Sequence, residues 1–379
     1  MKTVGIICEY NPLHLGHQKQ LNIIRREYGD GCAIVCLMSG NFVQRGIPAI
    51  FDKSLRAKAA ILSGADLVLE LPVTYALSSA EGFAAGGVKI LSGFCDALCF
   101  GTETGTAETL TATAAALLSP AFPEALRVYL DQGLSFPAAR AAALGEKGAL
   151  LQNPNDILAV EYCKAILSQN AGLALMPITR EGGYHDEVAD RSNPSATAVR
   201  ALIAGQHDWK SCIPEAAQSV FEDAPIHTLA AGERAILARL RTMTDADFEA
   251  LPYGSEGLWR KLMHASRSCA ALEDIIAATK SKRYTRTRID RMVMCAFLCI
   301  TKEMLAAPAP YARVLAFSDT GREILKKARL TGSFPHVGEP MEDPYWQLEQ
   351  RCSDLYGLFR ENTPAPAGNE SKRRVFINK

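Results

Sequence analysis

The first half of the chain alternates short apolar runs with segments whose apolar residues recur at helical spacing. The apolar runs are TVGIIC, CAIVCLM, DLVLELP, DALCFG and LALMPIT. Runs this apolar, separated by helical segments, are typical of parallel strands that helices cover on both faces. The pattern therefore predicts an α/β fold with a doubly wound parallel sheet, in which a ligand binds at the carboxyl ends of the strands.

The helices expected in this half lie between the apolar runs. They span residues 17–26, 52–63, 75–91, 106–118, 124–131 and 156–168. Beyond about residue 205 the alternation stops, and helical periodicity dominates residues 230–241, 258–266, 272–279, 288–302 and 322–328. The sequence thus predicts an α/β domain over residues 1–205 and a mostly α-helical C-terminal domain over residues 206–379, which ends in a loosely ordered tail.

Composition and charge narrow the class of protein without changing this picture. The 379 residues are 48% hydrophobic and 22% charged, and 41 basic side chains balance 41 acidic ones. Zero net charge argues against a globally basic nucleic-acid binder, although a local basic patch could still contact phosphates. No apolar run approaches the roughly 18 residues that span a bilayer, and the N-terminus lacks the pattern of a signal peptide. We therefore expect a cytoplasmic protein without a membrane partner.

The eleven cysteines do not form a metal-binding or disulfide pattern. No Cys-x-x-Cys pair occurs, and several of the cysteines lie inside apolar runs. We expect buried, reduced thiols that pack as small hydrophobic residues, and no metal site.

The stretch EYNPLHLGH (residues 9–17) joins the first expected strand to the first expected helix. Pro12 and Gly16 mark a tight turn, and the helix start offers unpaired N–H groups and a positive dipole end to an anion. His14 and His17 can donate hydrogen bonds to phosphate oxygens, most usefully where negative charge builds in a transition state. Histidines on a solvated helix end are the alternative explanation.

A second stretch, RSNPSATAVRALI, follows the fifth expected strand. Ser195 suits the N-cap position of a helix, with Thr197 and Arg200 in its first turns. Taken alone, this is an ordinary capped helix.

The two stretches together resemble the paired signatures of the HxGH nucleotidyltransferase and class I aminoacyl-tRNA synthetase superfamily. Further segments, MSGNFVQRGIPAIFDKSLRAKAAI, DLVLELP, CFGTETG, NPNDILAVEY and ITREGGYHD, resemble the bacterial tRNA(Met) cytidine acetate ligase family across nearly all of residues 1–205. The resemblance implies that ATP activates acetate as acetyl-adenylate, releasing pyrophosphate. The acetyl group then passes to N4 of the wobble cytidine of elongator tRNA(Met), without acetyl-CoA.

The same resemblance assigns site residues. His14 and His17 are the expected catalytic pair, and Ser195, Thr197 and Arg200 are expected to hold the departing pyrophosphate. The full set of implied ATP contacts is Ile7, Cys8, Glu9, Tyr10, Asn11, Pro12, Leu13, His14, Leu15, Gly16, His17, Gln18, Lys19, Gln20, Gly101, Asn155, Arg180, Ser195, Thr197 and Arg200. Asn155 has an alternative role as a helix cap, and Gly101 as part of a plain turn.

The loop after the second strand is less informative. Arg45 and Lys53 are basic residues near the place where the acid or triphosphate would lie, with solvated surface charges as the alternative. Ile47 departs from the family's loop, where an acidic residue is expected. Asp52 and Glu103 are weak candidates for a general base in acetyl transfer, so the sequence names no base. Mg²⁺ can accompany ATP, but no carboxylate pair marks its ligands.

The segment TKSKRYTRTRIDR concentrates positive charge in a neutral protein. Backbone phosphates require such charge, and a tyrosine among the charges can stack on a base, although a solvated helix start explains the same pattern. The resemblance favours tRNA, and implies contacts by Lys280, Lys282, Arg283, Arg286 and Arg288.

Two rival functions remain open at this point. A small-molecule adenylyltransferase would use the same HxGH chemistry, but it would leave the long second half unexplained. A non-catalytic RNA-binding protein would retain only the nucleotide-binding fold.

Overall fold

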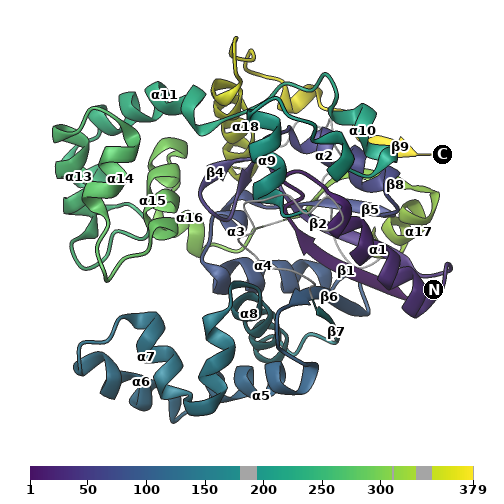
Figure 1. Cartoon of the computed structure of the whole chain (residues 1–379), viewed down its shortest axis with the longest axis horizontal. Helices are drawn as coiled ribbons and strands as arrows, with labels where there is room; N and C mark the ends of the chain where they lie inside the picture. Colours follow the sequence, from purple (N-terminus) through teal and green to yellow (C-terminus); the bar gives the residue numbers. More distant parts are fainter. Residues whose placement is uncertain (180–193, 310, 330–343, 379) are drawn as a thin grey trace.

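The computed structural model describes residues 1–179, 194–309, 311–329 and 344–378 (Figure 1). Its centre is a seven-stranded sheet in the order β7-β6-β1-β2-β5-β8-β9. The strands are β1 (Thr3–Cys8), β2 (Ala33–Ser39), β5 (Leu67–Leu71), β6 (Ala97–Thr102), β7 (Ala174–Thr179), β8 (Arg313–Ser318) and β9 (Phe376–Asn378). All five strands predicted from the apolar runs are present, which confirms the doubly wound α/β fold.

The first five of these strands in chain order are parallel, and β1 lies in the middle of them. β1 pairs with β2 on one side and with β6 on the other, so the chain winds outward in both directions from β1. Every residue of β2 and β5 is buried, because helices cover both faces of the sheet. The point where the winding reverses, beside β1, is where such sheets bind ligands.

Helices pack on both faces of the sheet. On one face lie α1 (Leu15–Tyr28), α2 (Lys53–Leu62), α9 (Ala196–Ala204) and α10 (Glu215–Phe221). On the other lie α3 (Val73–Ala76), α4 (Ala80–Leu91), α5 (Ala107–Leu118), α8 (Pro154–Ser168) and α17 (Asp319–Arg329). Beyond this second face are α6 (Phe122–Asp131), α7 (Phe136–Ala143) and the 3-10 turn η1 (Gly145–Gln152).

The single helix predicted for residues 75–91 is wrong. The chain forms two helices there, because Ser79 caps a new helix by accepting a hydrogen bond from the Gly82 N–H. The short α3 folds back against α4, where Gly86 contacts the ring of Tyr75. A β-carbon on Gly86 would lie 2.2 Å from that ring, so the close packing requires glycine.

A second group of helices, which we call the helical lobe, stands beside the sheet (Figure 1). It comprises α11 (Leu229–Thr242), α12 (Asp245–Glu249), α13 (Leu258–Ser268), α14 (Leu272–Thr279), α15 (Arg286–Leu298), α16 (Lys302–Ala306), α18 (Pro344–Tyr356) and the turn η3 (Gly357–Phe359). Its apolar core also includes Phe42, Val73 and Leu77 from the first half of the chain. The lobe is therefore built onto the α/β unit, with apolar contacts across the junction.

The apolar pattern predicts a mostly α-helical second half and misses strands β8 and β9. β8 pairs antiparallel with β5, and β9 pairs parallel with β8, so the second half of the chain completes the sheet of the first. It also missed a small antiparallel hairpin, β3 (Phe42–Val43) and β4 (Ile47–Pro48). The short 3-10 turns η2 (Lys210–Cys212) and η4 (Glu370–Lys372) complete the assignment.

All eleven cysteines lie within the described residues and have free thiols, and most are buried, as the sequence predicts. No helix in the described part of the chain is long and apolar enough to cross a membrane.

Candidate active site

A cavity of about 680 Å³ opens at the carboxyl ends of β1, β6 and β7, beside the start of α1. Its volume falls within the range that small-molecule and cofactor sites occupy. The described residues that line it are Ile6, Ile7, Cys8, Glu9, Tyr10, Asn11, His14, Gly16, His17, Lys19, Gln20, Asn22, Ile23, Arg26, Gln44, Arg45, Phe83, Phe100, Gly101, Asn155, Leu158, Tyr162, Ile178, Thr179, Ala196 and Arg200. The cavity thus lies where the sheet topology predicts a ligand.

Most of the ATP contacts expected from the resemblance line this one cavity. Pro12, Leu13, Leu15, Gln18, Ser195 and Thr197 do not line it. Arg180 lies outside the described residues. The cavity is also lined by Gln44, Phe100 and Tyr162, which lie in segments quoted for the resemblance but were given no role there, and by Phe83, which lies in none of them.

His14 and His17 stand at the start of α1 with their rings stacked, 3.8 Å between centroids. His14 is the N-cap residue, and its Nδ1 accepts a hydrogen bond from the Gly16 N–H (3.1 Å). The Nδ1 of His17 accepts one from the His14 N–H (3.2 Å). A neutral imidazole that accepts at Nδ1 carries its proton on Nε2. Both rings are therefore held in the tautomer that can donate to a phosphate oxygen through Nε2–H.

The helix start itself differs from the expectation of unpaired N–H groups. The Gly16 N–H donates to the His14 ring, and the His17 and Gln18 N–H groups donate to the His14 carbonyl. His14 thus satisfies these three groups of its own helix. The backbone at this turn is therefore already hydrogen-bonded where the sequence predicts open donors.

The two sequence signatures meet at Arg200. Its Nη1 donates to the Asn11 carbonyl (2.7 Å), 189 residues away in sequence, and its Nη2 donates to the Thr197 hydroxyl (3.1 Å). Ser195 is the N-cap residue of α9, as predicted, and accepts from the Ala198 N–H (3.1 Å). Arg200 lines the cavity, while Ser195 and Thr197 fix the helix start and the guanidinium that it presents.

Gly101 and Asn155 line the cavity from β6 and α8. Asn155 does not cap α8, whose N-cap residue is Asn153, so the capping alternative is wrong. Instead, Asn155 Nδ2 donates to Glu103 Oε1 (2.6 Å). Asn155 is therefore tied to the loop that follows Gly101.

Asp156, which is fully buried, fixes the shape of that loop. Its carboxylate accepts hydrogen bonds from the backbone N–H groups of residues 103–105, at 2.9 to 3.3 Å. Charge-assisted bonds of this kind are stronger than neutral ones. They hold the loop after β6 against the start of α8 at the edge of the cavity.

Arg56 of α2 fixes the loop after β2, a role that the resemblance does not imply although the residue lies in one of its segments. The side chain is fully buried, and it donates to the carbonyls of Phe51 (2.9 Å), Glu9 (2.5 Å), Ser39 (3.1 Å) and Gly40. A rigid guanidinium can serve several acceptors at once. Arg56 therefore ties the end of β1 to the loop that follows β2.

The hairpin beyond this loop brings Arg45 to the cavity, as expected, and Gln44 with it. The Gln44 N–H donates to Glu9 Oε1 (2.8 Å), and the Gln44 carbonyl accepts from Arg291 of α15 (3.3 Å). Ile47, at the position where the family's loop carries an acid, pairs with Val43 in the hairpin. The hairpin thus connects the cavity wall with the helical lobe.

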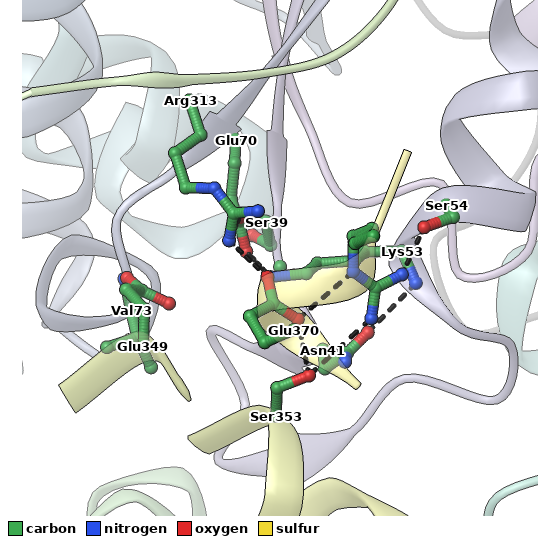
Figure 2. Close-up of polar contacts among 12 residues, drawn as sticks. Ser39, Asn41, Lys53, Ser54, Glu70, Val73, Arg313, Glu349, Ser353 and Glu370 are labelled. Atoms are coloured by element: carbon green, nitrogen blue, oxygen red, sulfur yellow. Dashed lines mark hydrogen bonds and ion pairs between the residues drawn. The ribbon is translucent and has the colours of Figure 1, made fainter. Parts of the chain in front are cut away.

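Lys53 does not line the cavity, and it is not a solvated charge either. Its ammonium lies 2.6 Å from Glu70 and 2.7 Å from Glu370, and is almost completely buried (Figure 2). We call the group around it the buried ionic cluster, which consists of Lys53, Glu70, Asp52, Arg313, Glu370 and Arg373. Its three cations and three anions come from both ends of the chain.

The two weak candidates for a general base are occupied elsewhere. Asp52 belongs to the buried ionic cluster and lies 2.5 Å from Arg373. Burial alone would raise the pKa of Asp52, but the guanidinium outweighs it and lowers the pKa to about 2. Glu103 accepts hydrogen bonds from the side chain of Asn155 and the backbone of α8. Neither carboxylate lines the cavity.

Several arginines of the basic segment are engaged within the helical lobe. Arg283 pairs with Glu256 (3.0 Å), and Arg286 forms a two-pronged pair with Glu273. Arg288 donates to the Tyr253 carbonyl and stacks over Tyr284, 5.0 Å from the ring centroid. Lys280 and Lys282 are exposed. The segment is thus less positive at its surface than its composition indicates.

Comparison with known proteins places this geometry in a family. The chain matches the model of the HIGH Nucleotidyl Transferase family over residues 1–371. It is 36% identical to a tRNA(Met) cytidine acetate ligase of Clostridium novyi, over 96% of this chain and 94% of that protein. It is 35% identical to the enzyme of the same name from Alkaliphilus metalliredigens, over 98% and 97% of the two chains.

Solved structures resemble this one over their full length. The crystal structure of Thermotoga maritima TmcAL without ligand superposes with a TM-score of 0.92 at 28% identity, covering 100% of this chain and 99% of that one. The same protein bound with alpha-thio ATP gives a TM-score of 0.90 at the same identity and covers all of both chains. The likeness therefore includes the helical lobe as well as the sheet.

Proposed function

Because the chain belongs to the HIGH nucleotidyl transferase family and, within it, to the tRNA(Met) cytidine acetate ligases, we propose that it joins acetate to a tRNA cytidine with the use of ATP. It is a ligase that forms a carbon–nitrogen bond. In the proposed first step the acetate carboxylate attacks the α-phosphate of ATP, giving acetyl-adenylate and pyrophosphate. In the second step N4 of the wobble cytidine of elongator tRNA(Met) attacks the acetyl carbonyl, giving N4-acetylcytidine and AMP. No acetyl-CoA takes part.

One observation carries the first step: His14 and His17 are locked side by side with Nε2 as the proton-bearing atom. Negative charge grows on the phosphate oxygens as the carboxylate attacks, and fixed donors stabilise it without reorganising. Arg200, anchored to Asn11 and Thr197, supplies the cation that accompanies the departing pyrophosphate. No covalent intermediate with the protein is required, because the donors only position and stabilise the reacting groups.

The remaining contacts follow from the cavity. Gly101 lets the nucleoside approach the end of β6 closely, and Asn155, fixed by Glu103, donates to it. Mg²⁺ bound to the triphosphate through phosphate oxygens and waters is compatible with this arrangement. ATP and tRNA are both cytoplasmic substrates, and a cytoplasmic location fits the proposal.

In this proposal the predicted second domain, residues 206–379, holds the tRNA. Lys280 and Lys282 are exposed just before the start of α15. Arg291 of the same helix contacts the hairpin that lines the cavity. Arg283, Arg286 and Arg288 would have to exchange their internal partners for phosphate. Tyr284 is largely buried beneath Arg288 and supports the segment rather than presenting a ring to a base.

The test is the exchange of labelled pyrophosphate into ATP, with and without acetate, followed by nucleoside analysis of tRNA incubated with labelled acetate. We expect exchange that depends on acetate, and N4-acetylcytidine in elongator tRNA(Met). His14→Ala or His17→Ala should lower the exchange rate by at least about 10²-fold, since each removes a donor to the attacked phosphate. His264→Ala, an exposed histidine of α13, is the matched control.

The outcomes separate the proposal from its rivals. Exchange that requires a phosphate ester instead of acetate would identify a small-molecule adenylyltransferase. Binding of tRNA without any consumption of ATP would identify a non-catalytic RNA-binding protein. Full activity in the His14→Ala variant would contradict the role of the histidine pair.

A further inference from the structure

Among the charged side chains of the described residues that line the cavity, one is negative and the others are positive. The described lining residues include the cationic side chains of Lys19, Arg26, Arg45 and Arg200, and a single carboxylate, that of Glu9. ATP and acetate are both anions, and like charges in a partly buried site repel. The resemblance places Glu9 among the ATP contacts, yet its carboxylate would repel both of these anions. It fits a ligand group that donates hydrogen bonds or loses a proton.

Glu9 is also held in a defined orientation. It directly follows β1, its backbone carbonyl accepts from Arg56 (2.5 Å), and its Oε1 accepts from the Gln44 N–H (2.8 Å). Among the described residues no donor reaches its second oxygen, Oε2. The side chain is thus fixed through one oxygen and presents the other.

The surroundings of Glu9 raise the pKa of its carboxylate. Burial raises the pKa of Glu9, and the Gln44 N–H and the guanidinium groups of Arg200, Arg45 and Arg56 act in the opposite direction. A general base acts best when its pKa lies nearer the working pH than that of an ordinary glutamate. Burial also raises the pKa values of Cys8, Tyr10 and Tyr162, which line the cavity with Glu9, so these groups stay neutral.

We propose that Glu9 recognises the target cytosine through its N4 amino group and accepts the proton that this group loses during acetyl transfer. The proposal rests on the function proposed above. Glutamate accepting from cytosine N4 is a known mode of base recognition. N4 forms its bond to the acetyl carbonyl carbon, and the bond between that carbon and the AMP phosphate oxygen breaks. AMP leaves with the electron pair, and the N4 proton passes to Glu9 Oε2 and then to water.

Two other roles would also place a carboxylate here. As a ligand of Mg²⁺ on the triphosphate, Glu9 would serve the first step. As a purely structural acceptor for the Gln44 N–H, it would serve neither step directly. The variant Glu9→Gln separates these roles, because glutamine keeps an acceptor oxygen for Gln44 but cannot bind Mg²⁺ as an anion or take up a proton.

The experiment measures the two half-reactions of each variant separately. The first is acetate-dependent pyrophosphate exchange with Mg²⁺ present, together with trapping of the acetyl group by hydroxylamine. The second is single-turnover acetylation of an elongator tRNA(Met) transcript, with a transcript carrying uridine at the wobble position as the blank. Glu27→Gln, an exposed carboxylate on α1, is the matched control, and thermal melting confirms that each variant is folded.

We expect Glu9→Gln to lower acetylation by about 10²–10⁴-fold, and by far more than it lowers exchange and trapping, because the proton passes to Glu9 only in the second step. Glu9→Asp, which keeps the charge at a shorter reach, should retain part of the acetylation. Acetylation by the unaltered protein should fall as the pH drops through the pKa of Glu9, because only the carboxylate can accept the proton. The Glu9→Gln variant should lack this dependence.

Each other outcome overturns the proposal. Loss of exchange together with acetylation would assign Glu9 to the first step, as a Mg²⁺ ligand. Undiminished acetylation in Glu9→Gln would leave it a structural role. If the unaltered protein shows no acetate-dependent exchange at all, the proposed function itself fails, which is a result distinguishable from either of these.

Discussion

Arg56 shows how one side chain can set the shape of a site that it does not touch. Its guanidinium donates to the carbonyl oxygens of Glu9 after β1, of Ser39 and Gly40 at the end of β2, and of Phe51 before α2. Among the described residues no carboxylate forms an ion pair with it. These carbonyls would otherwise be buried without donors. The backbone of Glu9 and the hairpin next to it depend on this arrangement.

Arg56→Ala should therefore lower the free energy of unfolding by on the order of 3–5 kcal/mol, because it opens a cavity and leaves several buried carbonyl oxygens without a hydrogen-bond donor. Urea denaturation at pH 7 measures the loss. Arg127→Ala, which removes an exposed partner of Asp131, should cost less than about 1 kcal/mol. Equal losses in the two variants would contradict the role assigned to Arg56.

For single residues, the sequence predicts those that belong to a motif and misses those whose role depends on where they lie in the folded structure. His14, His17 and Arg200 lie where their signatures place them. Lys53 is expected near the site because it is basic and close to a loop. Its ammonium instead pairs with the buried Glu370, far away in the sequence, and does not line the cavity. Glu9 begins the first signature and is expected among the ATP contacts, but that it is the one carboxylate among the described lining residues becomes visible only in three dimensions.

The hairpin β3–β4 is the element that joins the cavity to the helical lobe. Gly46 at its turn has a φ of 77°, and a β-carbon there would lie 2.5 Å from the backbone of Asp290 and Arg291 in α15. Both the left-handed conformation and the close approach require glycine. Gln44 and Arg45, two residues of the same turn, line the cavity.

Gly46→Ala should be compared with Gly133→Ala, which also has a positive φ (87°) but has open space around the added β-carbon. The backbone strain, on the order of 1–2 kcal/mol, is common to both variants. Only Gly46→Ala must also push the hairpin away from α15. We expect it to lose a further 1–3 kcal/mol or so in urea denaturation, and to acetylate tRNA more slowly. Similar behaviour of the two variants would mean that the contact with α15 is unimportant.

The elements that the sequence predicts well are those with a long, repeated pattern. The five apolar strands and most of their helices are in place, because a parallel sheet covered on both faces leaves an unmistakable apolar run. Strand β9 is a short edge strand and β8 lies next to it, and only the pairing of β8 with β5 of the first half makes the two part of this sheet. The break between α3 and α4 depends on one serine cap, which a continuous apolar pattern conceals.

At the scale of the whole molecule, charges buried between distant segments link stability to pH. The buried ionic cluster balances its own charges, but Glu349 of α18 lies beside it as an additional acid, accepting from the Val73 N–H (2.8 Å; Figure 2). Burial and the Glu70 carboxylate raise the pKa of Glu349 to about 7, against the lowering effect of Lys53. The folded protein therefore holds a proton on Glu349 that the unfolded chain has already released.

This raised pKa predicts a direction. Between the ordinary pKa of glutamate, roughly 4.3, and about 7, the folded state binds more protons, so stability contributed by Glu349 falls as the pH rises. Glu349→Gln keeps the acceptor for Val73 and removes the ionisation. It should match the unaltered protein at pH 5 and exceed it at pH 8 by on the order of 1–3 kcal/mol in urea denaturation. A Glu349→Gln variant that is less stable at pH 8 would show that the ionised form is the one that the fold prefers.

A division near residue 205 stays a prediction from the change of pattern, and that pattern does not indicate how the two halves combine. Phe42 and Val73 enter the core of the helical lobe, and Arg313 and Glu370 enter the ionic cluster beneath the sheet. Such contacts leave no periodic signal, since each partner looks like an ordinary apolar or charged residue in its own segment.

The composition of the ionic cluster has a consequence for synthesis on the ribosome. Asp52 and its partner Arg373 are 321 residues apart, so the early members of the group emerge long before their last counter-charges are translated. Until then Lys53 of α2 and Glu70 of β5 must remain hydrated, because Glu370 and Arg313 are not yet present to pair with them. The nascent chain should consequently close this cluster only once the segment around Arg373 has been synthesised, in a late step that brings that segment back to α2.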